Sequence, residues 1–174
     1  MKAPVVLLGA LLILAATSAS PRPSASASTA TGLLRLPRAA RAGETSIYGH
    51  VRSLRLRRGR WELKLDPALP LHGLTAERAA LEDTGSADVP NDVYTVEEGH
   101  RLLTYLVPNH TPVTILTRGP STTAVSVREL ASILRGGNPN GRRLFGQPRQ
   151  FGFWLRVGAK YPAPVLSIDE QYTP

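Results

Sequence analysis

This sequence predicts a mostly β domain with two short helices, folded as a small, twisted antiparallel barrel of the OB type. Three observations favour that fold: a long alternating hairpin near residue 46, several further short apolar segments bounded by turn residues, and two short helices with capping residues. The domain is expected to span residues 46–174. The chain has no Cys, so its core must be stabilised by packing without disulfide bonds.

The hairpin is predicted by alternation on two adjacent strands. Apolar residues occupy the odd positions up to Val51 and the even positions from Leu54 onwards, so one extra residue near Ser53, a β-bulge, is expected. Arg58-Gly59 fits a two-residue turn, and Asp66-Pro67 should end the return strand. The return strand is expected to place three apolar residues in the core: Trp61, Leu63 and Leu65.

The two helices are predicted from their ends. Thr75 is expected to cap a short helix that stops at Gly85, and Ser126 with Glu129 forms a capping box for a second helix that ends near Arg135. Further strands are expected over residues 93–96, 101–107, 113–117, 151–157 and 166–168. The Gly- and Pro-containing stretch 138–150 is expected to be a mobile loop.

The N-terminal region has the layout of a secretory signal peptide. Lys2 precedes an apolar run over residues 3–16, and small and polar residues follow. The run is shorter than the ~20 apolar residues that cross a membrane, so cleavage between Ala16 and Ala27 is expected, with a signal anchor as the alternative. Residues 1–27 are assigned to the signal peptide and residues 28–45, rich in Ser, Ala, Pro and Arg, to a disordered linker. The expected location is secreted or envelope-associated, without a membrane span after cleavage, and the absence of Cys argues against a lipoprotein.

Several sequence blocks together resemble a family of uncharacterised exported proteins of actinobacteria. The blocks are Leu65-Asp66-Pro67-Ala68, Thr75-Ala76-Glu77-Arg78-Ala79-Ala80 with Glu82-Asp83, Val89-Pro90-Asn91-Asp92-Val93-Tyr94, Glu98-Gly99-His100-Arg101-Leu102-Leu103-Thr104-Tyr105, Val113-Thr114-Ile115-Leu116-Thr117, Phe153-Trp154-Leu155-Arg156-Val157 and Asp169-Glu170-Gln171-Tyr172. The resemblance implies export and a single compact domain. The family has no assigned activity, so no functional residue is transferred from it.

The positive charge is concentrated in one stretch. Residues 28–60 contain eight Arg and one acidic residue, whereas residues 61–174 contain eleven basic and twelve acidic residues. With the bulge in place, Tyr48 and His50 should share an outward face with several cations, an arrangement that favours contact with polyanions. The predicted polyanion-binding residues are Arg52, Arg55, Arg57, Arg60 and Lys64. After export the expected partners are an anionic cell-wall polymer of the teichoic type or lipid headgroups, and not nucleic acid. The alternative is a solvated face in which Glu62 pairs with an Arg.

No motif in the chain assigns a catalytic residue, a cofactor or a metal. The four His residues have no helical i, i+4 spacing and no Cys to support a metal site, and the acidic patch of Glu82, Asp83, Asp88 and Asp92 does not fit a calcium loop. The sequence therefore predicts a non-enzymatic binding module of undefined partner and oligomeric state. The alternative is an envelope hydrolase with a carboxylate pair, such as Asp66 with Asp169 or Glu97 with Glu98. Buried carboxylates with raised pKa values in a cleft would favour the enzyme, and a convex basic face would favour binding.

Overall fold

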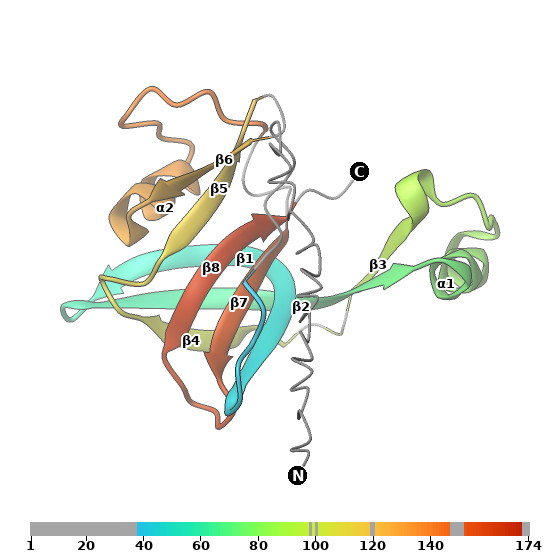
Figure 1. Cartoon of the computed structure of the whole chain (residues 1–174), viewed down its shortest axis with the longest axis horizontal. Helices are drawn as coiled ribbons and strands as arrows, with labels where there is room; N and C mark the ends of the chain where they lie inside the picture. The colour runs from blue at the N-terminus through green and yellow to red at the C-terminus, as the bar shows by residue number, and fades with distance from the viewer. Residues whose placement is uncertain (1–37, 98, 100, 119–120, 147–151, 172–174) are drawn as a thin grey trace, which may run out of the picture. The chain divides into compact units, whose positions relative to one another are not determined.

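The computed structural model describes residues 38–97, 99, 101–118, 121–146 and 152–171, which form a mostly β fold (Figure 1). The strands are β1 Glu44–Arg57, β2 Arg60–His72, β3 Val93–Glu97, β4 Leu103–Val107, β5 Val113–Thr117, β6 Ser121–Val125, β7 Gly152–Gly158 and β8 Val165–Gln171. The helices are α1 Leu74–Thr84 and α2 Val127–Ile133, with a 3-10 turn at Pro90–Asp92. The predicted signal peptide and most of the predicted linker lie outside the described residues.

The sheet is open, so the predicted OB-type barrel is not supported. Its strand order is β3-β2-β1-β7-β8-β5-β6, with β4 also paired to β2. All pairs are antiparallel except β5–β8, which is parallel and joins only Val113 to Ile168 and Thr114 to Asp169. Because β6 pairs with β5 and not with β4, the last strand does not return to the first. Instead, α2 contributes Val127, Leu130 and Ile133 to the core formed by the inner face of the sheet.

The β1–β2 hairpin is confirmed, including its bulge and its turn. The register shifts between Val51 and Ser53, so Arg52 is the extra residue. Arg58 and Gly59 have φ values of 49° and 75°, as a two-residue turn of type I′ requires. Three residues of β2 lie in the core as predicted: Trp61, Leu63 and Leu65. They share one cluster with Tyr105 and Val107 of β4 and with Phe153 and Leu155 of β7.

The prediction that Asp66-Pro67 ends the return strand is wrong. Strand β2 continues to His72, and its last five residues pair with β3. Pro67 pairs with Gly49 of β1 and Pro70 pairs with Thr95 of β3, and neither proline has a second strand partner among the described residues. Such an edge position tolerates a residue without an N–H. Helix α1 follows directly, and its N-cap is Gly73 rather than Thr75, whereas its end at Gly85 is as predicted, with a left-handed Gly85.

The C-terminal half of the chain confirms one helix and adds one strand. Ser126 caps α2 and accepts a hydrogen bond from the Glu129 N–H at 3.1 Å. Strand β6 was not predicted, and Asp169 and Glu170 lie inside β8 rather than after it. In the described part of the 138–150 loop, the Asn138 side chain donates to the Arg142 carbonyl and accepts from the Arg142 N–H, both at 2.8 Å. No helix in the described part of the chain is long and apolar enough to span a membrane.

Candidate polyanion-binding surface

The outer face of the hairpin gathers cations near the β1–β2 turn. The bulge places Arg55 and Arg57 opposite Glu62 and Arg60 on that face, and Arg58 projects from the turn. We call Arg55, Arg57, Arg58 and Arg60 the basic tip; all four are exposed. Because one carboxylate accompanies four guanidinium groups here, the tip carries a net positive charge.

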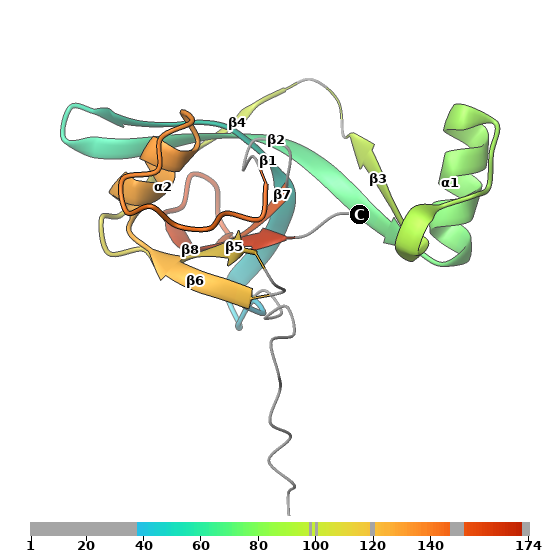
Figure 2. The ribbon, with the colours of Figure 1, turned by 90° about the horizontal axis from the view of Figure 1, so that it is seen from above.

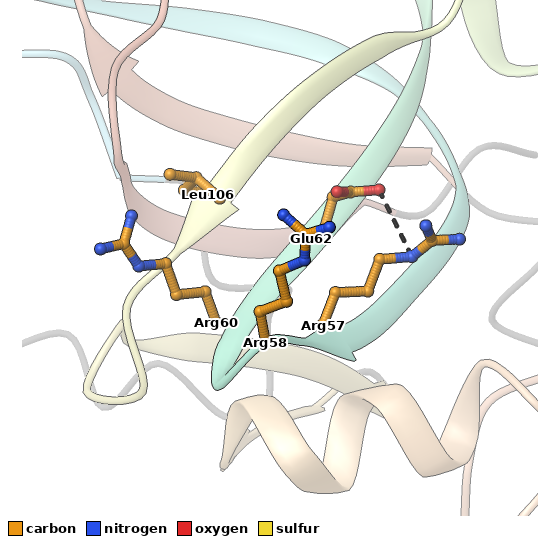
Figure 3. A pocket seen from close by; sticks show the side chains of 5 residues that line it. All are labelled: Arg57, Arg58, Arg60, Glu62 and Leu106. Carbon is orange, nitrogen blue, oxygen red and sulfur yellow. Dashed lines mark ion pairs between the residues drawn. The ribbon is translucent and has the colours of Figure 1, made fainter.

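A pocket of about 460 Å³ opens between these side chains (Figure 3). It is lined by Arg57, Arg58, Arg60, Glu62 and Leu106. Arg57 Nε lies 3.9 Å from Glu62 Oε1, and both side chains reach solvent, so this pair contributes little. The sequence alternative of Glu62 paired with an Arg is thus realised, but it neutralises only one cation of the basic tip. An anionic group in the pocket would meet Arg58 and Arg60 without displacing a strong ion pair.

The other two predicted binding residues lie further from the turn. Arg52 donates from Nε and Nη2 to Asp66 Oδ2 at 2.8 and 2.6 Å, so its charge is compensated. Lys64 is half-buried on β2 and stands opposite Ser53, between Glu62 and Asp66 along the strand. Of the five predicted residues, the structure therefore brings Arg55, Arg57 and Arg60 together at the tip and leaves Arg52 and Lys64 beside carboxylates.

The aromatic part of the predicted surface is not available for stacking. Tyr48 is only 3 % exposed, and its ring packs against Trp154 at a centroid distance of 5.2 Å. Gly152 permits this packing, since a Cβ there would overlap the Tyr48 ring. His50 Nε2 lies 3.3 Å from Glu97 Oε1. Tyr48 shares the outer face with His50, but the expectation that it is available for binding is wrong, because its ring is buried against Trp154 and Gly152.

Sequence reasoning missed three residues at the tip. Arg58 was assigned only to the turn, although its left-handed backbone leaves the side chain in the pocket lining. Leu56 and Leu106 are 52 % and 46 % exposed despite their apolar character. Leu106 also lines a pocket of about 350 Å³ with Arg60, Trp61 and Pro164, among others. Leu56 lines another of about 350 Å³ that reaches Arg128. For Leu56 the available signal was its position between two arginines and within two residues of the turn, whereas Leu106 has no such signal in the local sequence.

Of the two proposed catalytic pairs, Asp66 with Asp169 is not formed. Asp66 and Asp169 lie on strands three positions apart in the sheet, roughly 14 Å at ordinary strand spacing, which exceeds the separation used by glycosidases. Arg38 Nη1 donates to Asp169 Oδ1 at 2.7 Å, and Glu97 pairs with His50. Glu98, the other half of the second pair, lies outside the described residues.

One buried carboxyl has a strongly perturbed pKa. Glu170 is on the inner face of β8, opposite Phe153, and its Oε2 accepts the Leu116 N–H at 2.7 Å. Burial raises the pKa of Glu170 to about 7, and the hydrogen bond from Leu116 opposes that rise. The role of Glu170 is structural. The main-chain pairing of β5 with β8 ends at Thr114 and Asp169, so the Leu116 N–H of β5 finds its acceptor in the Glu170 side chain instead of the β8 main chain. It lines none of the three pockets at the hairpin tip.

A second carboxylate is held by a cation. Arg142 donates from Nε and Nη2 to the two carboxylate oxygens of Glu129, and from Nη1 to Thr123 Oγ1 at 3.2 Å. The hydrogen bond from Arg142 lowers the pKa of Glu129, against the effect of burial, and the Ser126 N–H adds to the lowering. This network joins the 138–146 loop to α2 and β6 and is therefore structural.

The acidic patch is occupied by local contacts. Tyr94 donates from its hydroxyl to Asp83 Oδ2 at 2.7 Å, and Arg78 pairs with Glu82 at 3.0 Å. Among the described residues, no three His, Cys, Asp or Glu side chains are arranged to hold a metal ion.

Comparison with protein-family models, with curated proteins and with solved structures finds no match for this chain. The geometry of the hairpin tip is consequently the basis on which a function can be argued.

Proposed function

We propose that this protein is an exported, non-enzymatic binding module that attaches to an anionic component of the cell envelope through the basic tip of its β1–β2 hairpin. The observation that carries the proposal is a pocket lined by three exposed guanidinium groups and a single carboxylate, with the exposed Arg55 opposite that carboxylate in the strand register. Guanidinium groups suit phosphate and carboxylate ligands because their donors form paired hydrogen bonds. The ligand class is therefore a polymer or surface that carries repeated phosphate or carboxylate groups.

The arginines also have a second explanation, protection of an unpaired strand edge, which the test must distinguish from polyanion binding. Beyond Gly49, β1 has no partner on its β7 side among the described residues, and charged side chains protect such an edge from pairing with other chains. Edge protection requires charge of either sign, whereas polyanion binding requires positive charge. A change from Arg to Glu keeps the first function and removes the second.

The test is a triple substitution of Arg55, Arg57 and Arg60 by Glu. Retention on immobilised poly(glycerol phosphate) or on phosphatidylglycerol vesicles should be strong for the native protein at low salt and should fall as salt screens the charges beyond about 8 Å at physiological ionic strength. The triple variant should not be retained at either salt concentration, with unchanged stability because exposed charges contribute little. Equal retention of the native and variant proteins would mean that the arginines only protect the edge.

A matched control uses three other exposed arginines. Substituting Arg118, Arg135 and Arg143 by Glu changes the net charge by the same amount at positions away from the hairpin. This control should retain most of the binding. If both triple variants lose binding equally, net charge rather than the basic tip is responsible.

Export is a separate part of the proposal, supported by the Lys2 start, the apolar run and the small residues that follow. N-terminal sequencing of protein from the culture medium or cell wall should place the first residue after a cleavage between Ala16 and Ala27. Recovery of the protein only from the cytosol, with Met1 intact, would contradict export and would exclude an envelope ligand.

A further inference from the structure

Exposed leucines lie beside the basic tip on both faces of the hairpin. Leu106 lies on the outer face, beside Arg60 and opposite Glu62 (Figure 3), and Leu56 lies on the inner face, opposite Trp61. We propose that the tip enters the headgroup layer of an anionic lipid bilayer, with Leu56 and Leu106 in the apolar boundary and the arginines at the phosphates. This inference rests on the proposed function and specifies its partner.

The leucines decide between a lipid surface and a soluble polymer. A polymer of repeated phosphates is fully hydrated and offers no apolar surface, so half-exposed leucines would gain nothing from it. A bilayer interface rewards both groups: apolar side chains are buried at the acyl boundary, and Arg side chains extend along them with the guanidinium in the headgroups. Each cation near an anionic membrane strengthens binding about fivefold.

The pockets beside the tip continue this apolar surface. The pocket that Leu106 shares with Arg60 also involves Trp61, Val107 and Pro108. On the other face, the pocket at Leu56 includes Val127 and ends at Arg128 of α2. Apolar side chains at the tip are thus bordered by cations on both faces of the hairpin, which is the composition of an interfacial membrane contact.

The negative charge at the other end of β2 favours an orientation in which the basic tip approaches the membrane first. Residues 74–97, which we call the acidic arm, hold six carboxylates and one guanidinium. Figures 1 and 2 show the hairpin turn and α1 at opposite ends of β2, whose 13 residues extend over about 40 Å at ordinary strand rise. An anionic membrane repels the arm and attracts the tip, so it orients the domain with the hairpin first.

The absence of Cys in the native chain allows a direct test with single labels. The full chain with Leu106→Cys carries the environment-sensitive fluorophore NBD at the tip, and the matched control Leu74→Cys carries it on α1, where Leu74 is 82 % exposed. Addition of vesicles of phosphatidylcholine and phosphatidylglycerol should raise and blue-shift the emission at position 106 and leave position 74 unchanged. A fluorophore reports its own surroundings, so vesicle binding by another part of the chain does not produce the shift.

A second measurement uses unlabelled protein. Leu56→Gln and Leu106→Gln should each weaken binding to phosphatidylglycerol vesicles about five- to tenfold, since each removes a half-exposed leucine from the apolar boundary. Binding to soluble poly(glycerol phosphate) should not change. The control variants Leu74→Gln and Leu81→Gln, on the acidic arm, should bind vesicles like the native protein.

The outcomes separate this inference from the proposed function. If the label at position 106 is silent and the Gln variants bind vesicles normally, while the Arg55, Arg57 and Arg60 triple variant still loses poly(glycerol phosphate), the partner is a polymer and the membrane inference is overturned. If the triple variant binds both ligands like the native protein, both proposals are overturned. A shift at position 106 that requires phosphatidylglycerol supports both.

Discussion

Glu170 should make the stability of the fold fall as the pH rises through neutrality. The carboxyl is 6 % exposed in the core, and burial raises its pKa from 4.5 to about 7. The folded state therefore holds the Glu170 proton more tightly than the unfolded chain does. The stability from this group is complete below about pH 4.5, declines between pH 4.5 and 7, and is lost above about pH 7.

The magnitude follows from the same two pKa values. One pKa unit corresponds to about 1.4 kcal/mol, so the free energy of unfolding should drop by about 3 kcal/mol through this group alone between pH 4 and 8.5. Glu170→Gln removes the titration and keeps an oxygen that can accept the Leu116 N–H. At about pH 8.5 the variant should be more stable than the native protein by up to about 3 kcal/mol, and at about pH 4.5 the two should be nearly equal.

Urea unfolding followed by tryptophan fluorescence measures both proteins across this range. The difference between their unfolding free energies is the diagnostic quantity, because every other titrating group is common to both. Asp169→Asn is the neighbouring control, which should instead lose stability at neutral and alkaline pH because the ion pair with Arg38 is removed. A constant difference between Glu170→Gln and the native protein from pH 4.5 to 8.5 would show that Glu170 is not buried as a neutral acid.

Three further substitutions test the packing around the sheet. Trp61→Ala should cost roughly 3–5 kcal/mol in urea unfolding, as other large-to-small core changes do, and a loss under about 1 kcal/mol would place the indole outside the core. Gly152→Ala should cost roughly 1–3 kcal/mol because a Cβ overlaps the Tyr48 ring; no loss would mean that the ring lies elsewhere. Arg142→Ala should cost roughly 1–3 kcal/mol at neutral pH, and the cost should shrink as acid protonates Glu129, whose pKa Arg142 lowers; a cost independent of pH would contradict the pairing.

The hairpin could be predicted because its signals are local. Alternation, the change of parity that requires a bulge, and the Arg58-Gly59 turn all lie within about twenty residues, and strand pairing through a tight turn fixes the register. The start of α2 was likewise predicted from Ser126 and Glu129, since a capping box is complete within four residues.

The openness of the sheet depends on contacts that the local sequence does not encode. The parallel pairing of β5 with β8 joins residues 55 positions apart and consists of two residue pairs. The sequence near Val113 therefore does not indicate that β5 will pair with β8 or that this pairing will be short. Strand β6 is polar and pairs only with β5, which leaves it without the apolar alternation that marks a strand. The length of β2 beyond Pro67 is fixed by pairing with β3, and that contact overrides the local preference of proline.

The binding surface shows why alternation predicts the face of a strand and not its burial. Leu56 and Trp61 are opposite each other on the inner face, yet Trp61 is 8 % exposed and Leu56 is 52 % exposed. Trp61 has Val107 of β4 on its other side, whereas among the described residues β1 pairs with β7 only from Glu44 to Gly49. Leu56 therefore lies on the inner face at a point where β1 has no described neighbour on the β7 side. A residue that follows the core pattern thus becomes an exposed apolar side chain among arginines. In the part of the chain that the structure describes, the pairing of β1 with β7 ends before Leu56, and this leaves the hairpin end as a candidate membrane contact. Because β7 lies about a hundred residues further along the chain, the sequence around Leu56 does not indicate that exposure.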